Sequence, residues 1–179
     1  MSIIEGWDQP SFAAVAQSRP AGWDVRLLPE STLLGLDELL ARVRDARAEG
    51  AVVGLVCVED DWVGIVRPVP SGVRVLLSDA TAALDYDLAA DILDELGVDI
   101  PTEDDADTDE AWPEGDFALL EDLGASEQVM SVILDDEELY GAAQVLRIAD
   151  ELGFAEELAD AVGIDPDDMD DYLSDGAYD

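Results

Sequence analysis

Three apolar runs follow one another closely near the middle of the chain: "AVVGLVCV" at 51–58, "WVGIVRPV" at 62–69 and "VRVLLS" at 73–78. Only about three residues, "EDD" and then "PSG", separate one run from the next. Parallel neighbours in a sheet need a crossover of a dozen or more residues, whereas a short loop joins antiparallel neighbours. The spacing therefore predicts an antiparallel meander. The uninterrupted apolar character of 51–58 predicts a central, buried strand.

Two further strand-like runs precede the meander. The runs "SFAAVAQ" and "WDVRLL" flank "SRPAG", a turn sequence that contains both Pro and Gly. Between these runs and the meander, apolar residues recur at the spacing of a helix face, at Leu36, Leu39, Leu40 and Val43. Acidic residues open this segment and arginines follow in its later turns, as the helix dipole favours.

These elements occur in the order ββαβββ. They predict an α+β fold whose first half is a five-stranded, mostly antiparallel sheet with a helix on one face, because an apolar sheet face needs cover. Pro68 lies near the end of its run, where the loss of a backbone donor is tolerated.

The second half has a different apolar period, which is helical from residue 86 onward. Three stripes each stop at a glycine: 88–96, 145–152 and 154–162. Asp116 is expected to cap a short helix that ends at Gly124, and Ser126 to cap the helix after it. A small all-helical C-terminal region is therefore predicted to follow the sheet.

These patterns divide the chain into four parts. We expect a β-rich α+β domain at 1–98, an acidic spacer at 99–115, a helical region at 116–163 and an acidic tail at 164–179.

The charge is strongly asymmetric. Residues 1–74 carry seven arginines and eleven acidic residues, a net charge of −4, whereas residues 75–179 carry one arginine and thirty-four acidic residues, a net charge of −33. Adaptation to high salt would place acids on all exposed parts, so the asymmetry argues against it. The excess opposes binding to nucleic acid or to an anionic membrane and favours a basic protein partner, although it also serves solubility.

The residue types present exclude several kinds of chemistry. The chain has no His and one Cys, so it lacks the ligands of a zinc deaminase and the groups of a Ser-His-Asp or Cys-His nucleophilic site. It contains no glycine-rich nucleotide-binding loop. Paired carboxylates abound, but none is distinguished as a catalytic pair. We expect no cofactor and no catalytic residue.

The acidic stretch "PTEDDADTDEAWPEGD" matches a calcium-binding loop only in part. Asp105, Asp107 and Asp109 have the spacing of the first EF-hand ligands, but the position that requires Gly is Glu110 and the last ligand position is Asp116. No specific metal site is therefore predicted.

The same stretch holds the candidate partner-binding residues: Asp104, Asp105, Asp107, Asp109, Glu110 and Trp112. An indole within an acidic run has two explanations. Trp112 packs back on the domain, or it contacts a partner.

Nothing in the sequence indicates secretion or membrane insertion. The N-terminal "MSIIEGWDQP" lacks a basic n-region and an apolar h-region, and no apolar stretch approaches the roughly 20 residues that span a bilayer. Cys57 lies in an apolar run, as a buried thiol would, and Trp62 opens a strand, where it is expected in the core. We expect a cytoplasmic protein.

Several segments together resemble a known family: "VRVLLSDATAALDYDLAADIL", "FALLEDLGAS", "LDDEELY" and "ADELGFAEELADAV". They follow a β-rich half, and with it they are similar, over about residues 11–163, to the tRNA adenosine deaminase-associated proteins of high-GC Gram-positive bacteria. The resemblance implies an accessory protein without catalytic residues that contacts the deaminase or its RNA pathway.

The charge favours the deaminase over its RNA, because a strongly acidic half is repelled by tRNA and attracted to a basic, tRNA-binding protein surface. Two alternatives stay open. One is an acidic nucleic-acid mimic that blocks a basic cleft, and the other is an enzyme that uses carboxylates alone.

Overall fold

The computed structural model describes residues 11–46, 50–59, 61–106, 112–136 and 141–164. A six-stranded sheet in the order β2-β1-β3-β4-β5-β6 forms the middle of the molecule, and every neighbouring pair is antiparallel. Its strands are β1 (Phe12–Arg19), β2 (Gly22–Leu27), β3 (Val52–Val58), β4 (Trp62–Val69), β5 (Gly72–Leu77) and β6 (Glu114–Gly115). The predicted α+β class and antiparallel sheet are confirmed.

The sixth strand was not predicted. β6 is two residues long and pairs with Leu76 and Leu77 of β5, inside the stretch that was expected to be a spacer. A strand this short leaves no periodic pattern in the sequence. Its glycine is required, because Gly115 has a φ of 133° and a β-carbon there would lie 2.5 Å from the carbonyl oxygen of Val75.

Most helices fall where the sequence predicted them, with two exceptions: the four-residue helix at 103–106 was not predicted, and 116–124 is described below. The α-helices are α1 (Leu36–Arg44), α2 (Asp87–Leu96), α3 (Glu103–Ala106), α4 (Glu127–Asp135), α5 (Gly141–Leu152) and α6 (Ala155–Val162). Three short 3-10 helices, η1 (Glu30–Leu33), η2 (Ala80–Leu84) and η3 (Glu121–Leu123), connect them to the strands. The Ser126 hydroxyl accepts a hydrogen bond from the Val129 N–H at 3.2 Å, as expected of the cap of α4.

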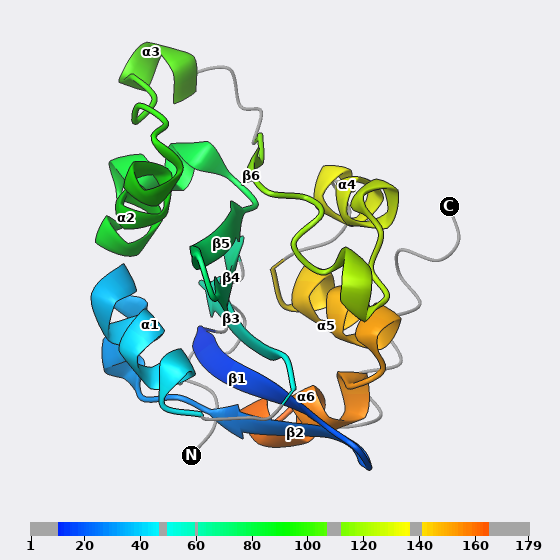
Figure 1. Ribbon diagram of the computed structural model, residues 1–179. Helices are drawn as coiled ribbons and strands as arrows, with labels where there is room; N and C mark the ends of the chain where they lie inside the picture. The colour runs from blue at the N-terminus through cyan, green and yellow to red at the C-terminus, as the bar shows by residue number, and fades with distance from the viewer. Residues whose placement is uncertain (1–10, 47–49, 60, 107–111, 137–140, 165–179) are drawn as a thin grey trace.

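Helices cover both faces of the sheet, not one (Figure 1). On the face at the left in Figure 1, which we call the near face, α1 and α2 pack on residues such as Val56 and Val66. On the opposite face, which we call the far face, α4, α5 and α6 pack on residues such as Leu55 and Ile65. The region after residue 116 therefore shares a core with the sheet. The reason is that β3 is apolar on both sides, so that its second face also needs cover.

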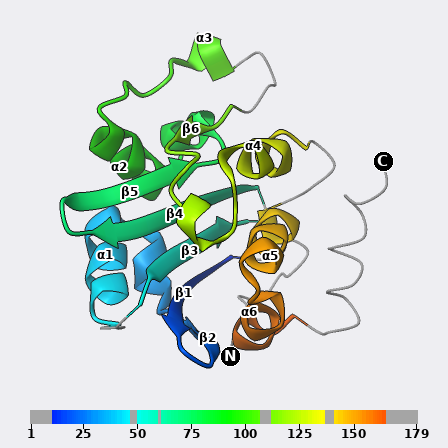
Figure 2. The same cartoon turned by 45° about the vertical axis from the view of Figure 1, so that its right-hand side comes forward.

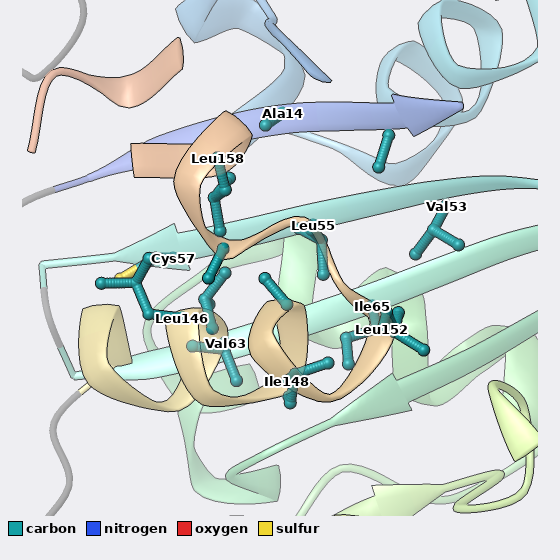
Figure 3. Packing of buried hydrophobic residues seen from close by; sticks show 14 of the residues in the cluster. Ala14, Val53, Leu55, Cys57, Val63, Ile65, Leu146, Ile148, Leu152 and Leu158 are labelled. Atoms are coloured by element: carbon teal, nitrogen blue, oxygen red, sulfur yellow. The ribbon is translucent and has the colours of Figure 1, made fainter. Parts of the chain in front are cut away.

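The far-face core joins α5 and α6 to the middle strands. Figure 3 shows Leu146, Ile148 and Leu152 of α5 and Leu158 of α6 over the strand residues, among them Cys57. All of these side chains are less than a tenth exposed. Burial of each large aliphatic side chain favours folding by about 1.5–3 kcal/mol. The expectation that Cys57 and Trp62 are buried is confirmed, because both are fully enclosed.

Residues 116–124 do not form the predicted capped α-helix. Asp116 accepts a hydrogen bond from the Ala118 N–H at 3.0 Å, which begins a turn, and η3 follows. The adjacent Leu119 and Leu120 are both fully buried in the far-face core. A tight turn lets neighbouring side chains enter one core, and a single isolated helical turn has little stability of its own.

Candidate interaction surface

The residues predicted to bind a partner lie on and after α3. Asp104 is exposed on that four-residue helix, and Asp105 belongs to the same helix. Asp107, Asp109 and Glu110 lie outside the described residues. Their role in binding stays a prediction.

Trp112 packs back on the domain. Its side chain is half-buried against the near-face core, and its carbonyl oxygen accepts a hydrogen bond from the Ala80 N–H at 2.8 Å. These contacts hold the chain against η2 immediately before β6. Trp112 thus anchors the end of the acidic stretch to the sheet.

A second set of acids belongs to η3, α4, α5 and α6, the helical layer that covers the far face of the sheet (Figure 2). The exposed members are Glu121, Glu127, Asp135, Asp150, Glu151, Glu156, Glu157 and Asp160. Within 112–136 and 141–164, the only basic residue is Arg147, which is half-buried. This side of the molecule therefore presents negative charge with little compensation.

Some of these acids occupy unfavourable positions. α1 follows the usual rule, with Asp37 and Glu38 in its first turn and Arg42 and Arg44 in its last. α5 instead ends on Asp150 and Glu151 and has no basic residue in its last turn. An acid beside the negative end of a helix dipole is disfavoured by about 0.3–1 kcal/mol at low ionic strength.

Five of the acids lie on neighbouring elements at one corner of the layer. The η3 turn lies against the end of α5. The closeness is shown by Gly124, where an added β-carbon would lie 3.3 Å from the Glu151 carbonyl oxygen. Only Gly153 and Phe154 separate α5 from α6, whose first turn carries two more acids. We define the acidic corner as Glu121, Asp150, Glu151, Glu156 and Glu157. It lies on regular elements of the fold.

Other acids of the second half are paired within the molecule. Arg67 of β4 and Arg74 of β5 stand directly opposite each other in the sheet. Like charges opposite one another destabilise a sheet unless something compensates them. Both side chains meet aspartates from the segment after β6, and these ion pairs connect the two halves of the chain.

The geometry of these ion pairs is close. Arg67 donates to both carboxylate oxygens of Asp122, at 2.5 and 2.8 Å, and to the carbonyl oxygen of Leu119 at 2.7 Å. Arg74 Nε donates to Asp116 Oδ2 at 2.5 Å. The hydrogen bond from Arg67 holds the pKa of Asp122 below its usual range, and that from Arg74 does the same for Asp116. We call this set of four residues the ion-pair clamp.

The clamp was not predicted from the sequence, where Asp116 was expected to cap a helix. A signal was present in the alternation of β4, where Val63, Ile65 and Arg67 share one face, so that Arg67 extends an apolar row. The partner of that arginine is 55 residues away and is fixed only by the fold.

A further acidic group lies at the end of the sheet where β3 turns into β4. The pKa of Asp61 is raised by burial and by the nearby Asp79, Glu59 and Asp85 carboxylates. The hydroxyl of Tyr86 donates to Glu59, which raises the pKa of that phenol to about 12. None of the groups that shift the pKa of Asp61 is a cation, so negative charge is concentrated at this end of the sheet.

Three observations bear on other kinds of site. A hollow of about 360 Å³ at the end of α1 is lined, among the described residues, by Arg44, Arg67 and apolar residues. In the described ranges, no cluster of three or more His, Cys, Asp or Glu side chains is placed to hold a metal ion. Among the helices of those ranges, none has the length and apolar character needed to cross a membrane.

Comparisons with known proteins agree with one another. A model of the family described as Rv3753c-like tRNA adenosine deaminase-associated protein matches residues 11–155. The chain is also 47% identical over 153 residues to Protein Rv3753c of Mycobacterium tuberculosis (strain ATCC 25618 / H37Rv), an alignment that covers 85% of this chain and 88% of that protein. No solved structure shows a significant match. These matches confirm the resemblance that the short sequence segments indicated.

Proposed function

The chain belongs to the Rv3753c-like tRNA adenosine deaminase-associated protein family, and from that premise we propose that it is a non-catalytic accessory protein whose acidic second half docks on a basic protein surface. The family description names the tRNA adenosine deaminase, so this enzyme is the proposed partner. An enzyme that binds tRNA needs basic residues to neutralise phosphates. We place both proteins in the cytoplasm.

The observation that carries the proposal is the acidic corner. It gathers five exposed carboxylates where α5 ends and α6 begins, beside η3. Two of them, Asp150 and Glu151, lie at the helix end where the dipole disfavours acids. Function is expected at positions where a residue contradicts a local rule, such as the preference of helix ends for one sign of charge. Complementary charge would make association fast and sensitive to salt.

The proposal is tested by titrating the purified deaminase with the full chain at low and moderate salt, by calorimetry or biolayer interferometry. We expect binding that weakens as salt rises, because the attraction between exposed charges is screened. Absence of binding at low salt would contradict the proposal.

Neutralising the acidic corner tests whether it contacts the deaminase. The variant Asp150→Asn/Glu151→Gln/Glu156→Gln/Glu157→Gln removes four charges, and we expect at least about tenfold weaker binding. A matched control, Asp87→Asn/Asp94→Asn/Glu95→Gln/Asp99→Asn, removes four exposed charges on and after α2. Equal losses in the two variants would show that total charge, and not the corner, governs binding.

The acidic stretch at α3 is a second proposed contact. Asp104 is exposed there, and the predicted residues that follow it continue the same run of carboxylates. The variant Asp104→Asn/Asp105→Asn is expected to weaken binding less than the corner variant does, because it removes fewer charges. Unchanged binding would restrict the contact to the helical layer.

A nucleic-acid mimic is the second candidate function, and one observation favours it. A mimic needs acids held on a rigid surface, and the corner acids lie on or beside helices that are packed into the core. Competition separates the two candidates. A mimic occupies the tRNA-binding cleft and displaces tRNA, whereas an accessory protein docks on a basic surface outside that cleft and leaves tRNA bound.

The non-catalytic role has its own test. The chain has no His and a single, buried Cys, so it cannot assemble the zinc site of a deaminase. We expect the chain alone to release no ammonia from adenosine in tRNA. Any such activity that survives removal of contaminating enzyme would refute this role.

A further inference from the structure

The two edges of the sheet are built differently. One edge is formed by β6, which has only two residues. The other is β2, which runs for six residues, Gly22–Leu27, and contains neither proline nor lysine. Short edge strands, prolines and charged side chains, lysine above all, are among the devices that keep sheet edges from pairing. The two charged residues of β2, Asp24 and Arg26, have opposite signs and can therefore pair with each other across two copies.

Hydrogen bonds define which backbone groups of β2 point outward. The Leu28 N–H donates to the Ala13 carbonyl at 2.8 Å, so residues 22, 24 and 26 of β2 face β1. The N–H and C=O groups of Trp23, Val25 and Leu27 therefore face away from the sheet. In the part of the chain that the structure describes, no hydrogen bond reaches these outward groups.

The side chains of β2 are suited to a strand partner. Trp23, Val25 and Leu27 lie on the far face, half-buried against its core, and the Trp23 ring is 4.8 Å from that of Phe154. Asp24 and Arg26 alternate with them on the other face. Arg26 is exposed and has no ion pair within the described residues, and Asp24 contacts only the exposed Arg19 there, at 3.3 Å.

We propose that β2 pairs with β2 of a second copy of this chain, antiparallel and about a two-fold axis at Val25. Outward backbone groups must meet outward groups, and the register that pairs all three outward residues places Val25 opposite the partner's Val25 and Trp23 opposite the partner's Leu27. The same register places Asp24 opposite the partner's Arg26, and the symmetry repeats that pair. Opposite charges and apolar side chains directly across two strands stabilise a sheet.

The charge distribution agrees with a pairing at this edge. Residues 11–28 contain two arginines and one aspartate, a net charge of +1 in a chain of net charge −37. Two such chains repel each other over most of their surfaces, and this hairpin adds no net negative charge to that repulsion. Added salt screens the remaining repulsion. Self-association should therefore strengthen with salt, opposite to the proposed binding of a basic partner.

The test is sedimentation equilibrium of the full chain over a range of concentrations, at about 0.05 and 0.3 M NaCl. We expect a monomer–dimer equilibrium that shifts toward the dimer at the higher salt concentration. Arg26→Asp replaces both cross-strand pairs by Asp–Asp contacts, and we expect dimerisation to weaken about tenfold. The charge swap Asp24→Arg/Arg26→Asp restores opposite charges and should recover most of that loss.

A matched control and a second measurement complete the test. Arg42→Asp makes the same charge change on the exposed side of α1 and should leave dimerisation nearly unchanged. In the unmodified protein, the amides of Trp23, Val25 and Leu27 should exchange more slowly as concentration rises. A chain that stays monomeric at both salt concentrations would overturn the proposal and leave the edge to a strand of another protein. Equal effects of Arg26→Asp and Arg42→Asp would also overturn it.

Discussion

The two faces of the sheet are covered in different ways. The near face is covered by α1 and α2, which flank the meander in sequence, and the two helices are joined by the Asp91 carboxylate, which accepts the Leu36 N–H at 3.1 Å. The far face is covered by chain that arrives after residue 116, and the clamp of Arg67 and Arg74 holds that chain where it crosses the sheet. The near face therefore depends on apolar packing and a cap, and the far face also depends on charge.

Phe154→Ala should have the largest effect on this comparison. The ring is fully buried and joins α6 to Trp23 of β2, so its removal leaves a cavity in the far-face core. We expect a loss of about 3–5 kcal/mol in the free energy of unfolding, measured by urea denaturation. A loss below about 1 kcal/mol would show that the far-face layer adds little to the stability of the sheet.

Arg67→Ala tests the clamp and should have the next largest effect. The side chain is only 12% exposed, and its loss leaves the Leu119 carbonyl and Asp122 without their donor. We expect about 1–3 kcal/mol of destabilisation. The control Arg42→Ala removes an exposed pair with Glu38 at 3.4 Å and should change stability by less than about 0.5 kcal/mol. Similar values for both variants would contradict a special role for the clamp.

Asp91→Ala tests the corresponding link on the near face. The carboxylate caps the first turn of α1 from a different helix, so its loss leaves one N–H group at the start of that helix without its acceptor. We expect a loss of about 1 kcal/mol. Asp94→Ala, which removes a neighbouring exposed acid of α2, serves as the control. Hydrogen exchange should become faster at the start of α1 in the first variant only.

The dependence of folding stability on acid pH should also show that the far face relies on charge. Asp116 and Asp122 have folded pKa values below their usual value of 3.8, so their contribution is present above that pH and is lost as pH falls through the folded values. The double variant Asp116→Asn/Asp122→Asn should therefore lose less stability than the natural chain between about pH 5 and pH 3. An unchanged slope in thermal unfolding would show that the clamp does not titrate with folding.

Replacing Asp61 should have the smallest effect on stability, with a pH dependence opposite in sign to that of Asp116 and Asp122. Its folded pKa is raised, so the ionised carboxylate disfavours the folded state at neutral pH, and this penalty disappears as pH falls below the unfolded pKa. Asp61→Asn should raise the unfolding temperature slightly at pH 7 and give no gain near pH 3. A larger gain at acid pH would refute the assignment.

The sequence revealed the proposed interaction surface only as an excess of acidic residues. The excess of acids after residue 75 is visible in the sequence. Their division into the paired Asp116 and Asp122 and the exposed Glu156 and Glu157 is not, because it depends on which carboxylates meet an arginine. Trp112 is a similar case, since both explanations of its indole suited the sequence and only its packing decided between them.

Local structure followed from the pattern of neighbouring residues. Short loops imposed antiparallel hairpins, the apolar period placed the main helices, and the double-sided apolar strand β3 required cover. Three features depended on the folded chain: the second half provides this cover, two residues form β6, and 116–124 is a turn. Such features depend on contacts between residues far apart in the chain, which the period and spacing of nearby residues do not specify.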